Sequence, residues 1–322
     1  MKVLVTGGAG MLGSSLVPAL VGAGHDVTVT DIDLSNTTPW GPDGAVIGEL
    51  DVRDRDGVSR TVERLAPDLV VHLAAETSLE YSDLNVDATY LTNTVATKYV
   101  ALAARKVDAA MVYISTAGVF DGTKPSKVYD EYDQPNPLNV YGATKYYGEL
   151  VVKQFVDRHY IIRAGWMVGG GRSKDHKFVS RILQQIRDGK KTLHAVGDKL
   201  GTPTYTPDFA RTFLGLVDSE LYGLYHMACE GRGSRYDVAA RILEVLGLTD
   251  AIELVEVDSD FFAEEFPSVR PHTEIMRNMN LDLQGMNLMR PWQVALEEYI
   301  HNEFGDLIAG STSTADNNGQ GA

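Results

Sequence analysis

Tyr141 and Lys145 stand four residues apart, in a Tyr-x-x-x-Lys arrangement that could carry proton-transfer chemistry. Residues four apart on a helix lie on the same face, so the lysine ammonium would stand beside the phenol. A positive charge there lowers the pKa of a phenol from its reference of about 10. Such a tyrosine can donate a proton to a carbonyl oxygen while hydride reaches the carbon, and the lysine can also hold a nicotinamide ribose. The pair therefore predicts a nicotinamide-dependent oxidoreductase.

Because such a pair also arises by chance, its weight comes from its context. Thr116 ends a segment at 110–115 that is predicted to be a strand, and the pair opens a helix predicted over 140–158. At the carboxyl end of a parallel strand, a hydroxyl points toward the crevice where ligands bind. Thr116 could hydrogen-bond the same carbonyl oxygen and stabilise the charge that grows on it. The predicted catalytic set is therefore Thr116, Tyr141 and Lys145.

Three glycines follow the first predicted strand, at 2–6, in a G-x-x-G-x-x-G spacing. The first allows a tight turn, the second lets the backbone approach a diphosphate, and the third permits close packing of a helix predicted over 11–24. The N-terminus of that helix offers free N–H groups and a partial positive charge to an anion. The predicted diphosphate contacts are Gly7, Gly10, Met11, Leu12 and Gly13.

The choice between the two nicotinamide dinucleotides depends on Asp31, at the end of a strand predicted over 26–30. Its carboxylate can accept hydrogen bonds from both hydroxyls of the adenosine ribose and would repel a 2′-phosphate. NAD(H) is therefore favoured and NADP(H) is still allowed, with Asp33 as a competing acid nearby. Asp51 and Val52 follow a third predicted strand, where the adenine would lie. Further cofactor contacts are expected at Leu73, Ala74 and Ala75.

These side chains need elements that bring them to one edge of a sheet. Short apolar runs alternate with helix-length segments through about residue 165, with further strands predicted at 45–50, 69–73 and 160–163 and helices at 54–65 and 87–106. This alternation is typical of a parallel sheet wrapped by helices, and right-handed crossovers make such a sheet doubly wound. The chain is predicted to be an α/β protein of the Rossmann type.

The pattern loosens after residue 165, which predicts a second lobe. Residues 1–165 are expected to form the dinucleotide-binding domain, with a returning segment near 202–228, and 166–304 to form mainly a smaller substrate-binding lobe. Helices are predicted at 178–189, 208–217, 236–246 and 291–304. From residue 309 the chain has almost no apolar content, so 305–322 are predicted to be a disordered tail.

Composition limits the partners. Acids outnumber bases 44 to 29, giving a formal net charge of −15. A nucleic-acid polymer or an anionic membrane surface would be repelled by this field, whereas a small anionic ligand needs only a local positive pocket. No apolar run approaches the length of a membrane span. Cys229 is the only cysteine, which points to a reducing cytoplasm, and the eight histidines show no metal-ligand spacing.

With these residues in place, the chain resembles the extended short-chain dehydrogenases/reductases, and within them the dTDP-4-dehydrorhamnose reductases. The glycine loop and the Tyr/Lys pair are common to the whole superfamily. More specific to this branch are the segments Asn-Pro-Leu-Asn-Val-Tyr-Gly, Gly-Thr-Pro-Thr-Tyr and Arg-Pro-Trp. Together the matching segments span about residues 1–300: 6–13, 74–77, 115–122, 136–149, 163–169, 201–205, 270–271 and 290–292.

The resemblance implies further site residues. It makes Asn93 a helper that props the lysine through water, and it places Thr77, Leu79 and Trp166 in the sugar and base site. Arg270, more than Arg290, would clamp the substrate diphosphate. The family usually has Asp-Tyr after Ser115 and Thr116, with the tyrosine facing the substrate, but Ala117 and Gly118 stand here. The residue after Thr77 and the 171–177 segment also depart from the family, so the sugar or the nucleotide could differ from the usual one.

The leading hypothesis is an enzyme that reduces the 4-keto group of a 4-keto-6-deoxy sugar nucleotide with NAD(P)H, converting dTDP-4-dehydrorhamnose to dTDP-L-rhamnose, with a homodimer allowed. A sugar-nucleotide 4-epimerase that cycles bound NAD is the alternative enzyme. A 4,6-dehydratase is disfavoured, because Ala117 and Gly118 are not the acids such enzymes place near the catalytic threonine. A non-catalytic regulatory subunit, like that of methionine adenosyltransferase, is the alternative of another class.

Overall fold

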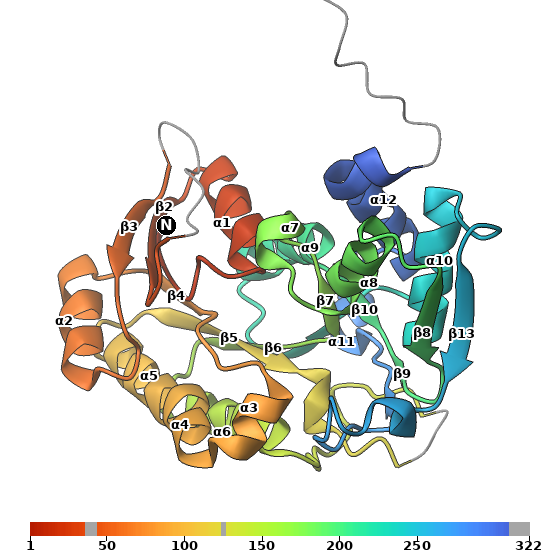
Figure 1. Cartoon of the computed structure of the whole chain (residues 1–322). Coiled ribbons are helices and arrows are strands. Elements are labelled where there is room, and N and C mark those ends of the chain that lie inside the picture. Colours follow the sequence, from red (N-terminus) through yellow and green to blue (C-terminus); the bar gives the residue numbers. More distant parts are fainter. Residues whose placement is uncertain (36–43, 124–126, 309–322) are drawn as a thin grey trace, which may run out of the picture.

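A parallel sheet of seven strands forms the centre of the protein (Figure 1). The structure is a computed structural model and describes residues 1–35, 44–123 and 127–308. The strand order is β11–β6–β5–β4–β1–β2–β3, so the order reverses between β1 and β4, and ligands of such sheets bind beyond the carboxyl ends at that point. The strands are β1 Lys2–Thr6, β2 Asp26–Asp31, β3 Val46–Glu49, β4 Leu69–His72, β5 Ala110–Thr116, β6 His159–Ala164 and β11 Gly223–Met227. The predicted doubly wound fold is confirmed.

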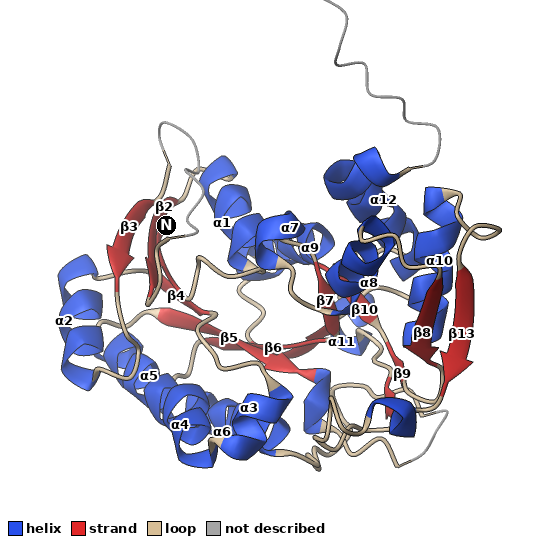
Figure 2. Cartoon of the chain, in the orientation of Figure 1, coloured by secondary structure: helices blue, strands red, loops and turns tan. Residues whose placement is uncertain are grey.

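Helices cover both faces of this sheet (Figure 2). Along β1, Val3 and Val5 lie in one hydrophobic core and Leu4 in the other, as expected for a strand buried on both faces. The first core holds α1 Gly13–Gly22 and α9 Thr206–Asp218. The second holds α2 Arg55–Leu65, α5 Ala96–Lys106 and α6 Val140–Phe155.

The single helix predicted over 87–106 is divided into three segments. α4 Val86–Tyr90 leads into the π-helical turn η1 Leu91–Val95 and then into α5, and a separate short helix, α3 Leu79–Leu84, precedes them. Asn93 lies in the π turn, where its carbonyl oxygen accepts hydrogen bonds from the hydroxyls of Thr97 (2.7 Å) and Tyr113 (3.4 Å). π turns often mark functional sites, but the apolar periodicity of the sequence gives no sign of one.

The second lobe is built from short sheets and helices around residues 166–304. β7 pairs with β10, β8 with β13, and β9 with both β12 and β14. Its elements are β7 Trp166–Val168, α7 Gly171–Lys174, α8 Phe178–Arg187, β8 Thr192–Val196, β9 Leu200–Gly201, β10 Pro203–Tyr205, β12 Gly233–Ser234, α10 Arg235–Leu246, β13 Glu253–Val257, η3 Ser259–Phe262, β14 Thr273–Glu274, α11 Met279–Leu283, α12 Trp292–Phe304 and η4 Gly305–Leu307.

The predicted lobe boundaries differ from the observed elements in two places. Of the segment expected to return at 202–228, α9 and β11 join the central sheet and its helices, whereas β10 pairs within the second lobe. The tail expected from 305 begins with η4, and Ile308 still packs against the core. Residues 309–322 lie outside the described part of the chain.

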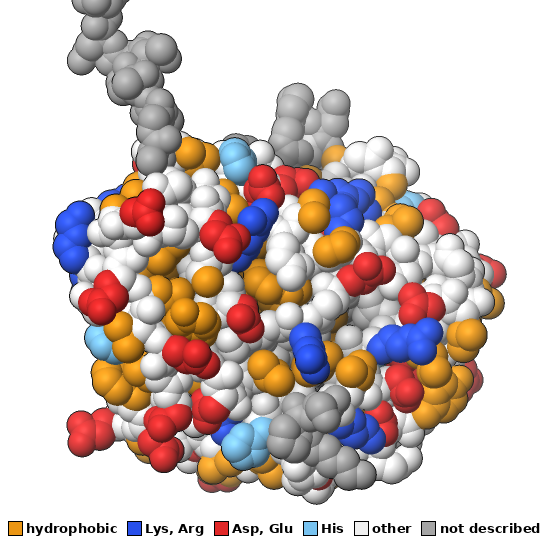
Figure 3. Space-filling model, turned by 90° about the vertical axis from the view of Figure 1, so that its right-hand side faces the viewer, with side chains coloured by type: hydrophobic (Ala, Val, Ile, Leu, Met, Phe, Trp, Pro, Cys, Tyr) orange, Lys and Arg blue, Asp and Glu red, His pale blue; other side chains and the backbone are white. Residues whose placement is uncertain are grey.

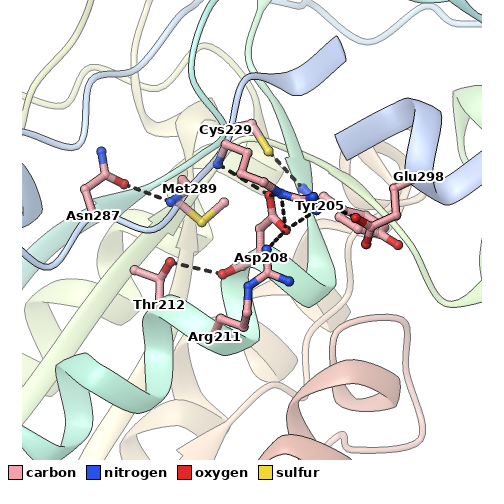
Figure 4. Close-up of polar contacts among 9 residues, drawn as sticks. Tyr205, Asp208, Arg211, Thr212, Cys229, Asn287, Met289 and Glu298 are labelled. Carbon is pink, nitrogen blue, oxygen red and sulfur yellow. Dashed lines mark hydrogen bonds and ion pairs between the residues drawn. The ribbon is translucent and has the colours of Figure 1, made fainter. Parts of the chain in front are cut away.

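A buried carboxylate ties the second lobe to a helix of the central sheet (Figure 4). Asp208, in the first turn of α9, has no exposed surface and accepts a two-pronged hydrogen bond from the guanidinium of Arg290, with Nη2 at 2.7 Å and Nε at 2.9 Å. Arg211 also pairs with Asp208, and Arg290 extends to Glu298 of α12 at 2.6 Å. Arg290 therefore holds α9 and α12 together, so the arginine of the Arg-Pro-Trp segment has a structural role.

The outer face of the second lobe carries acidic and basic side chains interspersed with neutral ones (Figure 3). Within the described ranges, no helix is long and apolar enough to cross a membrane, and no group of three or more His, Cys, Asp or Glu side chains could hold a metal ion.

Candidate active site

The glycine loop joins β1 to α1, and its three glycines meet different neighbours. Gly7 has φ +71°, and a Cβ on it would lie 2.4 Å from the amide nitrogen of Ala74. A Cβ on Gly13 would lie 2.0 Å from the carbonyl oxygen of Gly8, so this helix start requires glycine. At Gly10 the nearest protein atom to such a Cβ would be a carbonyl oxygen at 3.4 Å. Gly7 and Gly13 therefore serve the fold, and Gly10 keeps space beside the loop.

The amide groups at the start of α1 fit a diphosphate. The N–H groups of Met11, Leu12 and Gly13 donate to no acceptor among the described residues. Unpaired amides at a helix N-terminus favour a bound anion. Leu12 itself is buried in the core, so its side chain anchors the loop while its amide stays unpaired. The loop after β4, with Leu73, Ala74 and Ala75, lies against Gly7, as a shared cradle requires.

Asp31 ends β2 beside this loop. Its carboxylate accepts hydrogen bonds from the amides of Ala9 (3.0 Å) and Ile32 (2.7 Å), so backbone contacts fix its position. Lys174 of α7 reaches the same place, because its ammonium donates to the Ala9 carbonyl at 2.8 Å. Burial lowers the pKa of Lys174, and the Asp31 charge opposes that effect. The adenosine end of a dinucleotide would thus meet one acid and one base.

The two predicted adenine contacts are already engaged in other ways. Asp51 forms a two-pronged ion pair with Arg53, which lowers the pKa of the Asp51 carboxyl. Val52 is buried in the core beneath α2. Only the backbone at Val52 remains for a ligand, so its role as a cofactor contact stays a prediction.

Close backbone contacts fix α6 against β5. A Cβ on Gly142 would lie 2.2 Å from the carbonyl oxygen of Gly118, and a Cβ on Gly148 would lie 2.1 Å from the hydroxyl of Tyr113. Asn139 caps the helix by accepting from the amide of Gly142 at 2.8 Å. These contacts place the first two turns of α6, which carry Tyr141 and Lys145, beside the end of β5.

A buried ion pair fixes α6 one turn further on. Glu149 accepts two hydrogen bonds from Arg163 of β6, both at 2.8 Å, and one from the hydroxyl of Ser115 at 2.6 Å. Both charged side chains are almost fully buried. Because Ser115 precedes Thr116 and Glu149 follows Lys145 by one turn, this pair sets the position of the lysine relative to the strand end.

Thr116 and Tyr141 form a hydrogen-bonded pair at the predicted centre. The Thr116 oxygen accepts from the amide of Gly118 at 3.1 Å, so its hydrogen can be donated to the Tyr141 oxygen. Burial raises the pKa of Tyr141 to about 12, although the hydrogen bond with Thr116 lowers it; Glu274 and Glu76 raise it further. The pKa of Tyr141 in the ligand-free chain is therefore raised, not lowered as the Tyr-x-x-x-Lys spacing predicts, because burial is its largest cause.

Lys145 lies one helical turn beyond Tyr141 in a nearly closed space. Its ammonium stands 4.2 Å from the ring centre of Tyr113, and its side chain is buried. Burial lowers the pKa of Lys145 to about 7, with the Glu149 charge opposing that shift. The lysine is therefore poised to change its charge near neutral pH.

Asn93 makes structural contacts instead of contacting the lysine directly. Its amide nitrogen donates to the Glu76 carbonyl and to the Thr144 hydroxyl, both at 3.0 Å, and its oxygen accepts from the Glu76 amide at 2.9 Å. With both amide hydrogens used, Asn93 has no donor left for a water. It joins the loop after β4 to α6, and the water-mediated link to Lys145 stays a prediction.

The residues expected at the substrate separate into two groups. Thr77 is exposed after β4 and Leu79 opens α3, both at the same edge of the sheet. Trp166 is partly buried: it donates from Nε1 to Glu274 at 2.7 Å, and the guanidinium of Arg235 lies 3.8 Å from its ring centre. Arg270 pairs with Glu80 of α3 and donates to the Ser268 carbonyl at 2.9 Å, so it links the two lobes. Its role as a diphosphate clamp stays a prediction.

Three charged residues of the second lobe that sequence reasoning missed belong to this neighbourhood. Burial lowers the pKa of Arg235 to about 10, and Glu274 acts against that shift. Desolvation and the Arg235 charge lower the pKa of Lys177, and burial raises that of Glu274. They stand at the start of α10, at the cap of α8 and in β14. No spacing links them in the sequence, so only the fold reveals them.

Comparison with known proteins agrees with this geometry. The family model of the RmlD substrate binding domain matches residues 1–304. The spore coat polysaccharide biosynthesis protein SpsK of Bacillus subtilis is 32% identical, over 93% of this chain and 96% of that protein.

Two solved structures have the same overall fold. The dTDP-4-dehydrorhamnose reductase of Clostridium acetobutylicum has a TM-score of 0.83 and 31% identity, covering 94% of this chain and 99% of that one. The enzyme of the same name from Bacillus anthracis, solved in complex with NADP, has a TM-score of 0.82 and 29% identity, with the same coverage. The chain therefore belongs to the RmlD substrate binding domain family, within the extended short-chain dehydrogenases/reductases.

Proposed function

We propose that this protein reduces the 4-keto group of a 4-keto-6-deoxy sugar nucleotide, with dTDP-4-dehydrorhamnose as the first substrate to test and dTDP-L-rhamnose as its product. The observation that carries the proposal is the pairing of Thr116 and Tyr141 at the end of β5, with Lys145 one helical turn along α6, at the same edge of the sheet as the glycine loop. The names of the reductases in the comparisons support the same substrate class.

Each of the three side chains has a distinct task in this reaction. A reduced nicotinamide, when bound, supplies the hydride to C4 of the sugar. Tyr141, which is protonated at neutral pH because burial raises its pKa, donates its proton to O4. Thr116 donates a hydrogen bond to the same oxygen and stabilises the charge that develops there. Lys145, one helical turn from Tyr141, would hold the nicotinamide ribose, and its ammonium would lower the cost of removing the phenolic proton.

The residues around the glycine loop fit a nicotinamide dinucleotide. The free amides of Met11, Leu12 and Gly13 would hold its diphosphate, and the space at Gly10 admits it. Asp31 would accept from the adenosine ribose hydroxyls and repel a 2′-phosphate, so we assign NAD(H) as the preferred cofactor. Lys174 gives NADP(H) a counter-charge at the same place, which keeps it as a weaker substitute.

Asp31→Asn tests this cofactor choice. The substitution removes the repulsion and leaves Lys174, so the ratio of Kd values for NADPH and NADH should fall by about tenfold or more, as expected for the loss of one close charge. A wild-type protein that already prefers NADPH would contradict the assignment.

The activity itself is tested by following the loss of NADH or NADPH absorbance with a panel of 4-keto sugar nucleotides. Turnover of at least one sugar is the expected result. Tight binding of the dinucleotide without oxidation by any sugar would overturn the reductase and leave the regulatory subunit. Conversion of a sugar nucleotide to its 4-epimer, with no net change in cofactor, would identify the epimerase.

The assembly we propose is a homodimer through a surface on α4, η1 and α6, which we call the helix face. It carries the exposed apolar side chains of Leu91, Tyr147 and Leu150. The rings of Tyr90 and Tyr147 lie 6.0 Å apart, which shows that the helices adjoin there. A reducing compartment such as the cytoplasm suits the chain, since its single cysteine, Cys229, is a buried thiol.

A further inference from the structure

Gly118 leaves a small space open at the reacting end of the site. It lies in the 3₁₀ turn η2 Ala117–Val119, which follows β5 directly. A Cβ on Gly118 would lie 3.4 Å from the Thr116 hydroxyl oxygen and 3.6 Å from Oε1 of Glu274. The same space therefore separates the hydroxyl that would bind O4 from a carboxylate of the second lobe.

Glu274 is held so that one of its oxygens is available. Oε2 accepts from the indole nitrogen of Trp166 at 2.7 Å, which fixes the direction of the carboxylate. Oε1 accepts no hydrogen bond within the described part of the chain and is not one of its fully buried unpaired side-chain atoms, so a ligand can reach it. Burial raises the pKa of Glu274, and the Trp166 hydrogen bond and the charges of Arg235 and Arg270 oppose that shift. A carboxylate oxygen with no donor in the described chain is suited to accept from a ligand hydroxyl.

We propose that Glu274 is a substrate-recognition residue whose Oε1 accepts a hydrogen bond from the hydroxyl on C3 of the sugar. This inference rests on the proposed function, because O4 must lie at Thr116 and Tyr141. In a 4-keto-6-deoxy sugar, the carbons next to C4 carry a hydroxyl on C3 and a methyl group on C5. Only the C3 substituent can donate, so a carboxylate close to the O4 position selects it.

Gly118 makes this recognition possible by leaving room for that hydroxyl. The chain places no side chain between Thr116 and Glu274. A methyl group at position 118 would make only ordinary van der Waals contacts with its neighbours, so alanine fits there without moving the backbone. The pair of Gly118 and Glu274 then takes the place of the tyrosine that related reductases are expected to present to the substrate.

The first experiment compares a 4-keto-6-deoxy sugar nucleotide with its 3-deoxy analogue. Hydrogen bonds to charged groups predict that the wild type prefers the 3-hydroxy sugar by about 10- to 100-fold in kcat/KM. Glu274→Ala should lose this preference, with similar kcat/KM values on the two sugars. Glu274→Gln, which retains an acceptor oxygen, should keep part of it. Glu264→Gln, at an exposed position of the same lobe, is the matched control and should behave as the wild type.

The second experiment uses Gly118→Ala, which fills the space and leaves the Glu274 side chain intact. It should raise KM for the 3-hydroxy sugar more than for the 3-deoxy sugar, and leave the Kd for the dinucleotide unchanged. Equal loss of kcat/KM on both sugars in Glu274→Ala, with an unchanged Kd for the dinucleotide, would overturn the recognition role and leave the reductase intact. A wild type that reduces neither sugar would instead overturn the proposed function.

Discussion

Tyr141 keeps its proton because it is buried near two acids, and that state suits a proton donor. Its pKa of about 12 means that the phenol is protonated throughout the physiological range. The Thr116 hydroxyl beside it has its acceptor side occupied by the Gly118 amide. In the proposed reaction both hydroxyls would donate to the carbonyl oxygen as it gains charge.

Tyr141→Phe removes the proton and leaves the ring in place. We expect kcat to fall by about 10²- to 10⁴-fold, the usual contribution of a positioned general acid. The Kd for the dinucleotide should change little, since the glycine loop and Asp31 are untouched. Equal losses in turnover and cofactor affinity, measured by kinetics and by fluorescence titration, would contradict the role of Tyr141.

Lys145→Met tests the lowered pKa of the lysine through stability. In the folded chain the pKa of Lys145 is about 7, against an ordinary value of 10.5, so between these pH values the unfolded chain binds more protons. The free energy of unfolding then rises with pH in this window, by at most about 1.4 kcal/mol per pH unit. The difference between wild type and Lys145→Met in urea unfolding should therefore grow in favour of the wild type from pH 7 to 9. A difference that stays constant with pH would show that the ammonium is well solvated.

At the scale of elements, α6 is the part that the site depends on most. Two glycines bring it close to β5, and the pair of Glu149 and Arg163 connects it to β6. A buried pair with several hydrogen bonds adds little net stability by itself, but losing one partner leaves a charge in the core. The position of Lys145 thus depends on an ion pair one helical turn away.

Glu149→Gln should destabilise the protein by about 3–5 kcal/mol, because the Arg163 charge would remain buried without its partner. The measurement is the free energy of unfolding in urea. Glu244→Gln removes the exposed partner of Arg241 and should cost about 1 kcal/mol or less. Similar costs for the two variants would mean that water reaches Arg163.

Two glycines of the glycine loop have different roles: Gly13 is needed for the fold, and Gly10 is proposed to admit the cofactor. Gly13→Ala forces a methyl group against the Gly8 carbonyl and should destabilise the fold by about 1–3 kcal/mol. Gly10→Ala meets no such contact, so its thermal stability should stay near that of the wild type while its Kd for the dinucleotide rises by about tenfold or more, since the methyl group occupies the diphosphate approach. Calorimetry and cofactor titration check the two effects, and an unchanged Kd in Gly10→Ala would contradict the proposed cradle.

At the scale of the whole molecule, the helix face predicts the state of association. Light scattering should give twice the chain mass of 35.2 kDa. Leu150→Asp places a charge in the proposed interface and should shift the protein to the monomer. Leu221→Asp, at an exposed apolar residue beside β11, is the matched control and should leave the mass unchanged. A monomer at all concentrations of the wild type would contradict the homodimer.

The sequence could predict most of the central sheet, because its strands are buried on both faces and its helices are amphipathic. Gly7, Gly13 and the Tyr141–Lys145 pair could also be predicted, because their roles depend on local spacing in the sequence. The cluster of Lys177, Arg235 and Glu274 was not, since its members come from three separate elements and meet only through the fold. The direction in which the Tyr141 pKa shifts could not be predicted from the sequence either, because burial of the phenol determines it.

The position of β11 at the edge of the central sheet has a consequence for how this enzyme could be recombined with its relatives. β11 pairs with β6 over five residues, yet it follows β7, α7, α8 and β8 to β10 in the chain, and β12 to α12 come after it. The second lobe is therefore built from two chain segments, one on either side of α9 and β11, and is not a detachable C-terminal module. A chimera cut once after β6 would exchange α9 and β11 together with the second lobe, so the β11 of one relative would have to pair with the β6 of the other. An exchange of the second lobe alone has to replace two segments, the one from β7 to β10 and the one that follows β11.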